Sequence, residues 1–169
     1  HLVQEQGTWK VIGDPTEGAL LAAGSKAGGN QEHIEKELPK HHEIPFDSDR
    51  KLSTVIRKMP GGKLRAFTNG APDVLLERCT DLYTCAGIHP ITDDERELIG
   101  AHNIAMAQQA LRVLGSAYRD LDDASPADLT ADVVERDLVF VGLSGMYDPP
   151  RQEAKEAVAK CRDAGIRVV

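Results

Sequence analysis

Residues 44–73 constrain the fold more than any other part of the sequence. Two runs in this stretch, 52–58 and 64–67, are rich in the β-branched and aromatic residues that favour strands. Between them, Gly61 and Gly62 can adopt the positive φ angles that a tight turn needs. The sequence therefore predicts an antiparallel hairpin.

The same stretch ends in a turn that opens a helix. Gly70 lacks a Cβ, Pro72 suits the first helical position, and Asp73 places an acid in the first turn. A strand, a bare-backbone turn and a helix N-terminus together let a ligand approach the main chain, where free N–H groups favour an anion. On local pattern alone, an ordinary hairpin followed by a capped helix also explains these residues without any ligand.

The composition is that of a globular domain. The chain has 169 residues, of which 41% are hydrophobic, enough for one domain and part of a second. No window approaches the apolar length of a membrane helix, and the first residues do not resemble a signal peptide. The chain itself is therefore expected to be soluble. A start at His1 and an apolar end at Val168 and Val169 predict a piece cut from a longer protein.

Charge and cysteine content narrow the class of partner. The net charge is −7 and no Lys/Arg cluster stands out, so we expect no nucleic-acid partner. The three cysteines are odd in number and lack zinc-site spacing, which indicates a reducing compartment and no metal site. The adjacent His41 and His42 diverge and are interpreted as surface residues.

Two capping patterns predict helices. Asp14 as N-cap, Pro15 at the first position and Glu17 as the third residue begin a helix that stops at 28–29. The glycine-rich residues 24–29 lack the Gly-Lys-Ser/Thr ending of a P-loop. A charged connector over 31–40 and a loop over 81–90 are expected. The second capping box, in 92–95, begins a helix that runs to about Leu111.

The second half of the chain is expected to add two strands and a terminal helix. Residues 113–118 look strand-like, and 120–132 form an acidic loop with one helical turn. The apolar run 138–143 predicts a strand buried on both faces. Helical spacing follows over 154–161, with Gly165 as C′ residue and a strand from 166. A composition shift near Asp148 divides the chain into domains 1–147 and 148–169.

Five motifs occur in an order that resembles P-type cation-transporting ATPases. They are G-D-P-T-E-G-A-L at 13–20, P-F-D-S-D-R-K-L-S at 45–53, N-G-A-P-D at 69–73, L-R-V-L at 111–114, and D-P-P-R with C-R-D-A-G-I-R-V-V at the end. The set resembles the nucleotide-binding domain plus the first return into the phosphorylation domain, and is most similar to type II calcium-transporting pumps. The resemblance implies an α+β fold, an antiparallel sheet flanked by helices, with a short C-terminal αβ fragment of the phosphorylation domain.

The resemblance also implies a function. In this family the domain binds ATP, as Mg-ATP in the full-length pump, and delivers it to an aspartate on a neighbouring domain at the cytoplasmic face of a membrane. The implied partners are the nucleotide and the phosphorylation and actuator domains of the same parent chain, with no direct membrane contact. The D-K-T-G-T motif and the magnesium-binding acids are missing, so we expect no catalytic residue and no phosphoenzyme here. Asp148 and Arg151 resemble the hinge, or are a helix cap and a surface arginine.

The family's nucleotide site maps onto eight residues. By resemblance, Phe46 would stack on adenine, Glu17 would lie near the adenine amino edge, and Lys51 would close the slot. Gly70 and Ala71 would line the pocket floor. Arg112 would reach toward the phosphates, and Leu114 would pack beside the ring. The eighth position is Asn69.

Each assignment has a structural alternative. Glu17 could serve only the capping box, Phe46 could be core, and Lys51 could be ordinary surface. Arg112 is expected to end a helix, where a cation stabilises the dipole without any ligand. The adjacent Asp49 and Arg50 could pair and hold the shape of their loop.

Asn69 departs from the family pattern. The family has lysine at this position, and asparagine cannot supply an ammonium charge to a triphosphate. A non-catalytic interaction or regulatory domain that has lost the nucleotide is therefore the alternative to an ATP-binding domain. A free-standing hydrolase ranks third, because the sequence offers no nucleophile or metal cluster. The transported ion cannot be read from this chain, since ion sites in such pumps lie in membrane helices.

Overall fold

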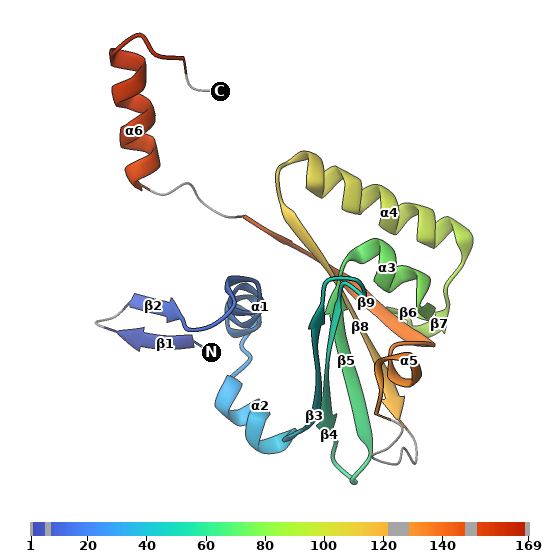
Figure 1. Ribbon diagram of the computed structural model, residues 1–169. Coiled ribbons are helices and arrows are strands. Elements are labelled where there is room, and N and C mark those ends of the chain that lie inside the picture. The colour runs from blue at the N-terminus through green and yellow to red at the C-terminus, as the bar shows by residue number, and fades with distance from the viewer. Residues whose placement is uncertain (1, 6–7, 122–128, 148–151, 168–169) are drawn as a thin grey trace.

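A mixed sheet forms the body of the protein in the computed structural model, which describes residues 2–5, 8–121, 129–147 and 152–167 (Figure 1). The sheet has seven strands in the order β3-β4-β5-β8-β9-β6-β7, and only the β6–β9 pair is parallel. The strands are β3 (Lys40–Asp47), β4 (Leu52–Lys58), β5 (Leu64–Gly70), β6 (Cys79–Thr84), β7 (Gly87–Pro90), β8 (Arg112–Leu121) and β9 (Leu138–Met146). A separate hairpin pairs β1 (Leu2–Glu5) with β2 (Thr8–Val11). The α+β class is confirmed.

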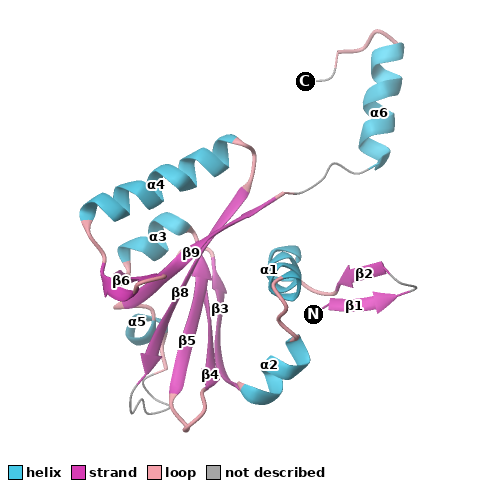
Figure 2. Cartoon of the chain, turned by 180° about the vertical axis from the view of Figure 1, so that it is seen from behind, coloured by secondary structure: helices cyan, strands magenta, loops and turns pink. Residues whose placement is uncertain are grey.

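The helices lie on both sides of this sheet. They are α1 (Pro15–Lys26), α2 (Gln31–Glu37), α3 (Pro72–Glu77), α4 (Asp93–Gln108), α5 (Ala131–Val134) and α6 (Gln152–Asp163). Helices α3 and α4 lie together on one side, α1 lies beyond β3 on the other, and α6 stands apart from the sheet (Figures 1 and 2). No helix in the described residues combines the length and apolar character needed to cross a membrane.

The predicted hairpin is confirmed as β4 and β5. They pair in register from Leu52 opposite Gly70 to Lys58 opposite Leu64. The turn contains Gly61 and Gly62 with φ of 88° and 86°, a conformation that side chains with a Cβ adopt only at a cost. The turn glycines therefore do what the sequence indicated.

One face of the hairpin is buried, and we call it the covered face. Leu52, Thr54 and Ile56 alternate along β4 as fully buried residues. Two apolar clusters form on this face, one with α3 and the other with α5. Their buried members are Leu52, Leu75, Cys79, Ala117, Leu138 and Phe140 in the first, and Ile56, Ala66, Leu121, Leu129 and Val134 in the second. The opposite face, which carries Ser53 and Val55 of β4, we call the open face.

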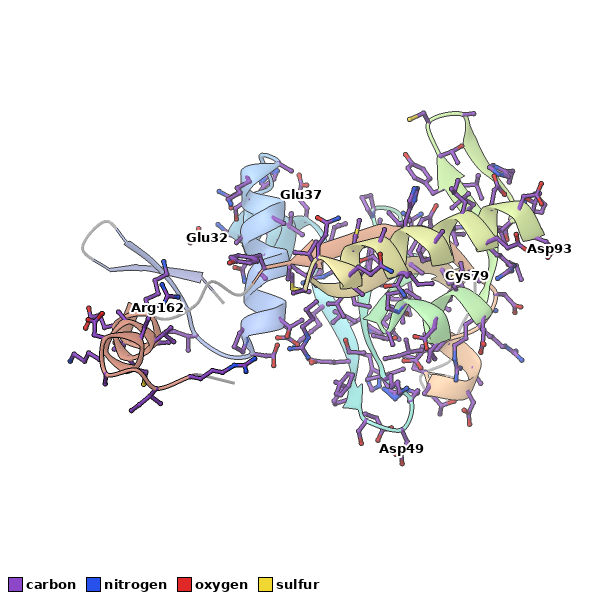
Figure 3. All side chains as sticks on the ribbon, turned by 90° about the horizontal axis from the view of Figure 1, so that it is seen from above. Glu32, Glu37, Asp49, Cys79, Asp93 and Arg162 are labelled. Atoms are coloured by element: carbon purple, nitrogen blue, oxygen red, sulfur yellow. The ribbon has the colours of Figure 1, made fainter. Side chains whose placement is uncertain are left out.

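Burial also settles the role of one cysteine. Cys79 is 2% exposed and donates from Sγ to the Leu75 carbonyl at 3.1 Å. Desolvation raises the pKa of the Cys79 thiol to about 12. Figure 3 places Cys79 among the side chains next to α4. Because nucleophilic chemistry needs the thiolate, Cys79 is a packing residue.

The predicted helix starts are confirmed. Asp14 caps α1 by accepting from the backbone N–H groups of Thr16 and Glu17, with Pro15 at the first position. The return bond of a capping box is absent there, because the Glu17 side chain makes no hydrogen bond within the described residues. In α4 the capping box is complete between Thr92 and Glu95, the third residue of the helix.

The capping acid of α4 makes stability depend on pH. Backbone hydrogen bonding from Thr92, with a further bond from His89, lowers the pKa of Glu95 from 4.5 to about 2. A depressed carboxyl pKa stabilises the fold above the unfolded value, and this contribution is lost as pH falls from 4.5 towards 2. Urea unfolding across this range should therefore show a smaller loss of stability in Glu95→Gln than in the unaltered chain. The exposed Glu97→Gln on the same helix should behave like the unaltered chain, and an equal slope in all three would contradict the assignment.

Several elements differ from expectation. The segment predicted as a charged connector contains α2, which Asn30 caps. The prediction of a loop over 81–90 is wrong, because β6 and β7 form a hairpin there. Strand β9 is not buried on both faces: Phe140 is 1% exposed but Val141 is 46% exposed. Ile166 and Arg167 are not in a strand, and residues 122–128 and 148–151, with the predicted boundary at Asp148, lie outside the described part.

Candidate functional site

A row of small polar positions crosses the open face near one end of the sheet. The strand register places Ser53 opposite Asn69, Asn69 opposite Ser116, and Ser116 opposite Gly142. A Cβ added to Gly142 would meet nothing within 4 Å. The row therefore carries hydrogen-bonding side chains, and the space next to Gly142 is open.

Asn69 has a defined partner in this row. The Ser116 hydroxyl donates to Asn69 Oδ1 at 2.7 Å, and both residues are half-buried. Because its oxygen accepts from Ser116, the Asn69 amide NH₂ is left as the group that can donate to a ligand. The position supplies a neutral donor without charge.

Gly70 is glycine for a reason that the sequence did not reveal. Its φ is not positive, and it is the last, buried residue of β5. A Cβ there would collide with the Lys51 carbonyl oxygen and lie 2.6 Å from Leu52 Cδ2. Contacts within the protein are therefore enough to require glycine at this position. The close approach also lets the Ala71 N–H donate to the Lys51 carbonyl at 3.1 Å.

The connection between β3 and β4 lies against Gly70. Asp47 Oδ1 accepts from the N–H groups of Asp49 at 3.0 Å and Arg50 at 2.9 Å, and Lys51 adopts a φ of 55°. These bonds, the one from Arg50 first, lower the pKa of Asp47. The expected Asp49–Arg50 pair is wrong: Arg50 pairs with Glu135 at 2.8 Å, while Asp49 lies at the outer tip of the connection (Figure 3).

Phe46 and Lys51, at the two ends of this connection, face solvent. The Phe46 side chain is 66% exposed, although phenylalanine is normally buried. The core alternative for Phe46 is therefore wrong. An exposed aromatic ring and an exposed ammonium group at the two ends of one connection can offer stacking and charge to one planar anion.

Strand β8 contributes two further predicted residues. The expectation that Arg112 ends a helix is wrong, because α4 ends at Gln108 and Arg112 is the first residue of β8. It is exposed, and Leu114 two residues later is half-buried. Since Gly70 pairs with Gly115, Leu114 is adjacent to the Gly70 end of β5.

Helix α1 reaches the same end of the sheet less directly. Its N-cap Asp14 has a lowered pKa, mainly from backbone hydrogen bonding by Glu17 and to a small extent from the charge of Arg112. Helix α1 also contacts β9. Glu17 itself is exposed, and no described contact joins it to Phe46 or Asn69.

Residues 2–153 match the family described as P-type ATPase, cytoplasmic domain N. The chain belongs to the P-type ATPases. The N domain of this family accounts for the seven-stranded sheet and for the order of the motifs.

No group of three or more His, Cys, Asp or Glu that could hold a metal occurs in the part of the chain that the structure describes.

The relatives of this P-type ATPase chain are named for the transport of several cations. The chain is 37% identical over 169 residues to a calcium-transporting ATPase of Bacillus subtilis, covering 100% of this chain and 19% of the relative. It is 40% identical over 161 residues to the cation-transporting ATPase pma1 of Synechocystis, covering 95% and 17%. It is 40% identical over 165 residues to the sodium/potassium exporting P-type ATPase cta3 of Schizosaccharomyces pombe, covering 97% and 16%. The chain thus spans less than a fifth of these relatives.

One buried charged residue near this site was not recognised in the sequence. Glu135 is fully buried and bonded to Arg50, Thr54 and Arg78. It follows Val133 and Val134 in a charged stretch and resembles a solvated helix end. The available signal for burial was that Glu135 directly follows two valines, and this signal is weak.

Proposed function

We propose that this chain is the ATP-binding N domain of a P-type cation pump. The domain presents ATP to an aspartate on a neighbouring domain that this chain does not contain, with Mg-ATP as the form used by the whole pump. The parent is an ATP-driven cation translocase whose nucleotide site faces the cytoplasm. The relatives' names include calcium and sodium/potassium, so cation is the substrate class proposed here.

One observation carries the proposal. Segments far apart in sequence meet at one end of the sheet: the Phe46–Lys51 connection, the Asn69–Ala71 strand end and the Arg112–Leu114 strand start. The first offers an exposed ring for stacking, the second the amide donor of Asn69, and the third a cation and an apolar side chain. Adenine, ribose and phosphate need these groups.

Exposure also fits the required cycle. A pump domain must hold ATP and release ADP in every cycle, so tight enclosure would slow turnover. Phe46 is largely exposed, and Glu17, Lys51 and Arg112 are exposed as well. We therefore expect weak, rapidly reversible binding by the chain alone.

Calorimetric titration with ATP tests the proposal against its alternative. Saturable binding supports an ATP-binding domain, whereas no heat at millimolar ATP supports a regulatory domain that has lost the nucleotide. Asn69 favours the alternative, because it carries no charge that could pair with a triphosphate. Hydrolysis of ATP by this chain would instead support the free-standing hydrolase.

Changing Asn69 to lysine measures the missing charge. Asn69→Lys should tighten ATP binding by about 1 kcal/mol, because a partly exposed ammonium group adds a charge-assisted contact to phosphate. Glu97→Gln raises the net charge by the same one unit on α4 and serves as the control. Unchanged or weaker binding by Asn69→Lys in calorimetry would refute the view that this position is short of charge.

A further inference from the structure

One arginine holds both sides of the connection that we call the adenine loop, residues 46–51. Arg50 donates from Nη2 to the Pro45 carbonyl at 2.7 Å and to the Leu52 carbonyl at 3.0 Å. It also donates from Nε to Glu135 Oε2 at 2.8 Å. The two carbonyls flank the loop, one on each side, so a single planar guanidinium fixes the separation of its ends.

Glu135 anchors this arginine in the core. The residue is fully buried at the C-terminal end of α5, and its side chain lies 85 positions from Arg50 in sequence. Its Oε1 accepts from the Thr54 hydroxyl at 2.8 Å, and Thr54 in turn bonds Thr68 at 2.9 Å. Both carboxylate oxygens are therefore satisfied only when Arg50 is in place.

Burial turns this pair into a restraint on the loop. The Arg50 side chain is 15% exposed and the Glu135 side chain 0%. A buried carboxylate that loses its partner remains as an uncompensated charge in a medium of low dielectric constant. Loop conformations in which Arg50 leaves Glu135 are therefore disfavoured, and one arrangement dominates.

We infer that Glu135 is a positioning residue for nucleotide binding, acting through Arg50 on the adenine loop. This inference rests on the proposed function. The pair presents the Phe46 ring and Lys51 in a fixed arrangement before ATP arrives. Apparent affinity falls in proportion to the fraction of molecules in the competent arrangement, so loosening the loop weakens binding without touching the ligand.

The decisive variant replaces both charges. Arg50→Met with Glu135→Leu leaves no buried charge, and apolar replacement of a buried ion pair commonly preserves the fold. We expect the Kd for ATP to rise about tenfold, because the bound loop arrangement would be populated in about a tenth of molecules. Hydrogen exchange without ligand should speed up at the amides of Lys51 and Ala71, which bond Asp47 and Lys51.

A second variant covers the case in which the first does not fold. Arg50→Lys keeps a cation near Glu135 but lacks the planar fork that reaches three acceptors. It should show the same two effects in smaller measure. The control is Arg65→Met with Asp120→Asn, which removes an arginine pair with bonds of 2.6 and 2.9 Å near the other end of the sheet. Neither ATP affinity nor exchange at Lys51 should change in it.

The outcomes separate a positioning role from a stabilising one. If the folded double variant matches the unaltered chain in urea stability, ATP affinity and exchange, the inference is overturned. Unchanged stability with a raised Kd and faster exchange supports it. Should the unaltered chain not bind ATP, the proposed function fails, and exchange alone decides whether the pair orders the loop: slow exchange in both variants overturns that as well.

Discussion

Replacing Gly70 with alanine is expected to lower the free energy of unfolding by about 1–3 kcal/mol. The new Cβ would collide with the Lys51 carbonyl oxygen and would lie 3.0 Å from the Leu52 Cα. Both are backbone atoms, so the clash cannot be relieved by turning a flexible side chain. The adenine loop must move away from β5, and the Ala71 N–H would then lose its acceptor.

Urea unfolding of Gly70→Ala measures this effect, and Gly142→Ala is its matched control. Gly142 is also a strand glycine of the same sheet, but a Cβ there meets nothing within 4 Å. We expect the control to retain its stability. Equal stability of the two variants would mean that the contact between Gly70 and the adenine loop does not constrain the fold.

Replacing Phe46 with alanine is expected to weaken ATP binding by about 1–3 kcal/mol, the cost of losing one base–aromatic stacking contact. Stability should change by less than about 0.5 kcal/mol, because the Phe46 side chain is 66% exposed and buries little surface. A large effect on affinity with a negligible effect on folding is the signature of a ligand-contacting residue. Calorimetry and urea unfolding on the same preparation give both values.

Tyr83→Ala provides the comparison for Phe46. Tyr83 is another exposed aromatic, at 53%, in the β6–β7 hairpin on the opposite edge of the sheet. Its removal should leave ATP binding unchanged. Equal losses in both variants would indicate non-specific contact with aromatic surface and would count against an adenine position at Phe46.

Signals that act over a few residues were readable from the sequence. The Gly61–Gly62 turn, the Asp14 and Thr92 caps and Pro72 at the first helical position depend on neighbouring backbone groups only. Local chemistry sufficed for these features. The family resemblance pointed separately to segments 46–51, 69–71 and 112–114, which meet at one end of the sheet, although Arg112 begins a strand and was expected to end a helix.

Features that depend on distant partners were not readable. Strand β6 exists because β9, more than fifty positions away, pairs with it in parallel. Strand β3 is an exposed edge strand without the alternation that marks a half-buried one. The same limit hid the link from Arg50 to Glu135, so the neighbouring Asp49 was taken as its partner. Gly70 was recognised as special, but the atoms it accommodates belong to another strand connection.

The most direct test of an adenine site at this end of the sheet is an NMR titration of the ¹⁵N-labelled chain with ATP. We expect saturable shifts confined to residues around Phe46, Glu17 and Gly70, with the hairpin β6–β7 unaffected. Silence throughout the spectrum at millimolar ATP, or shifts confined to surfaces away from these residues, would contradict it.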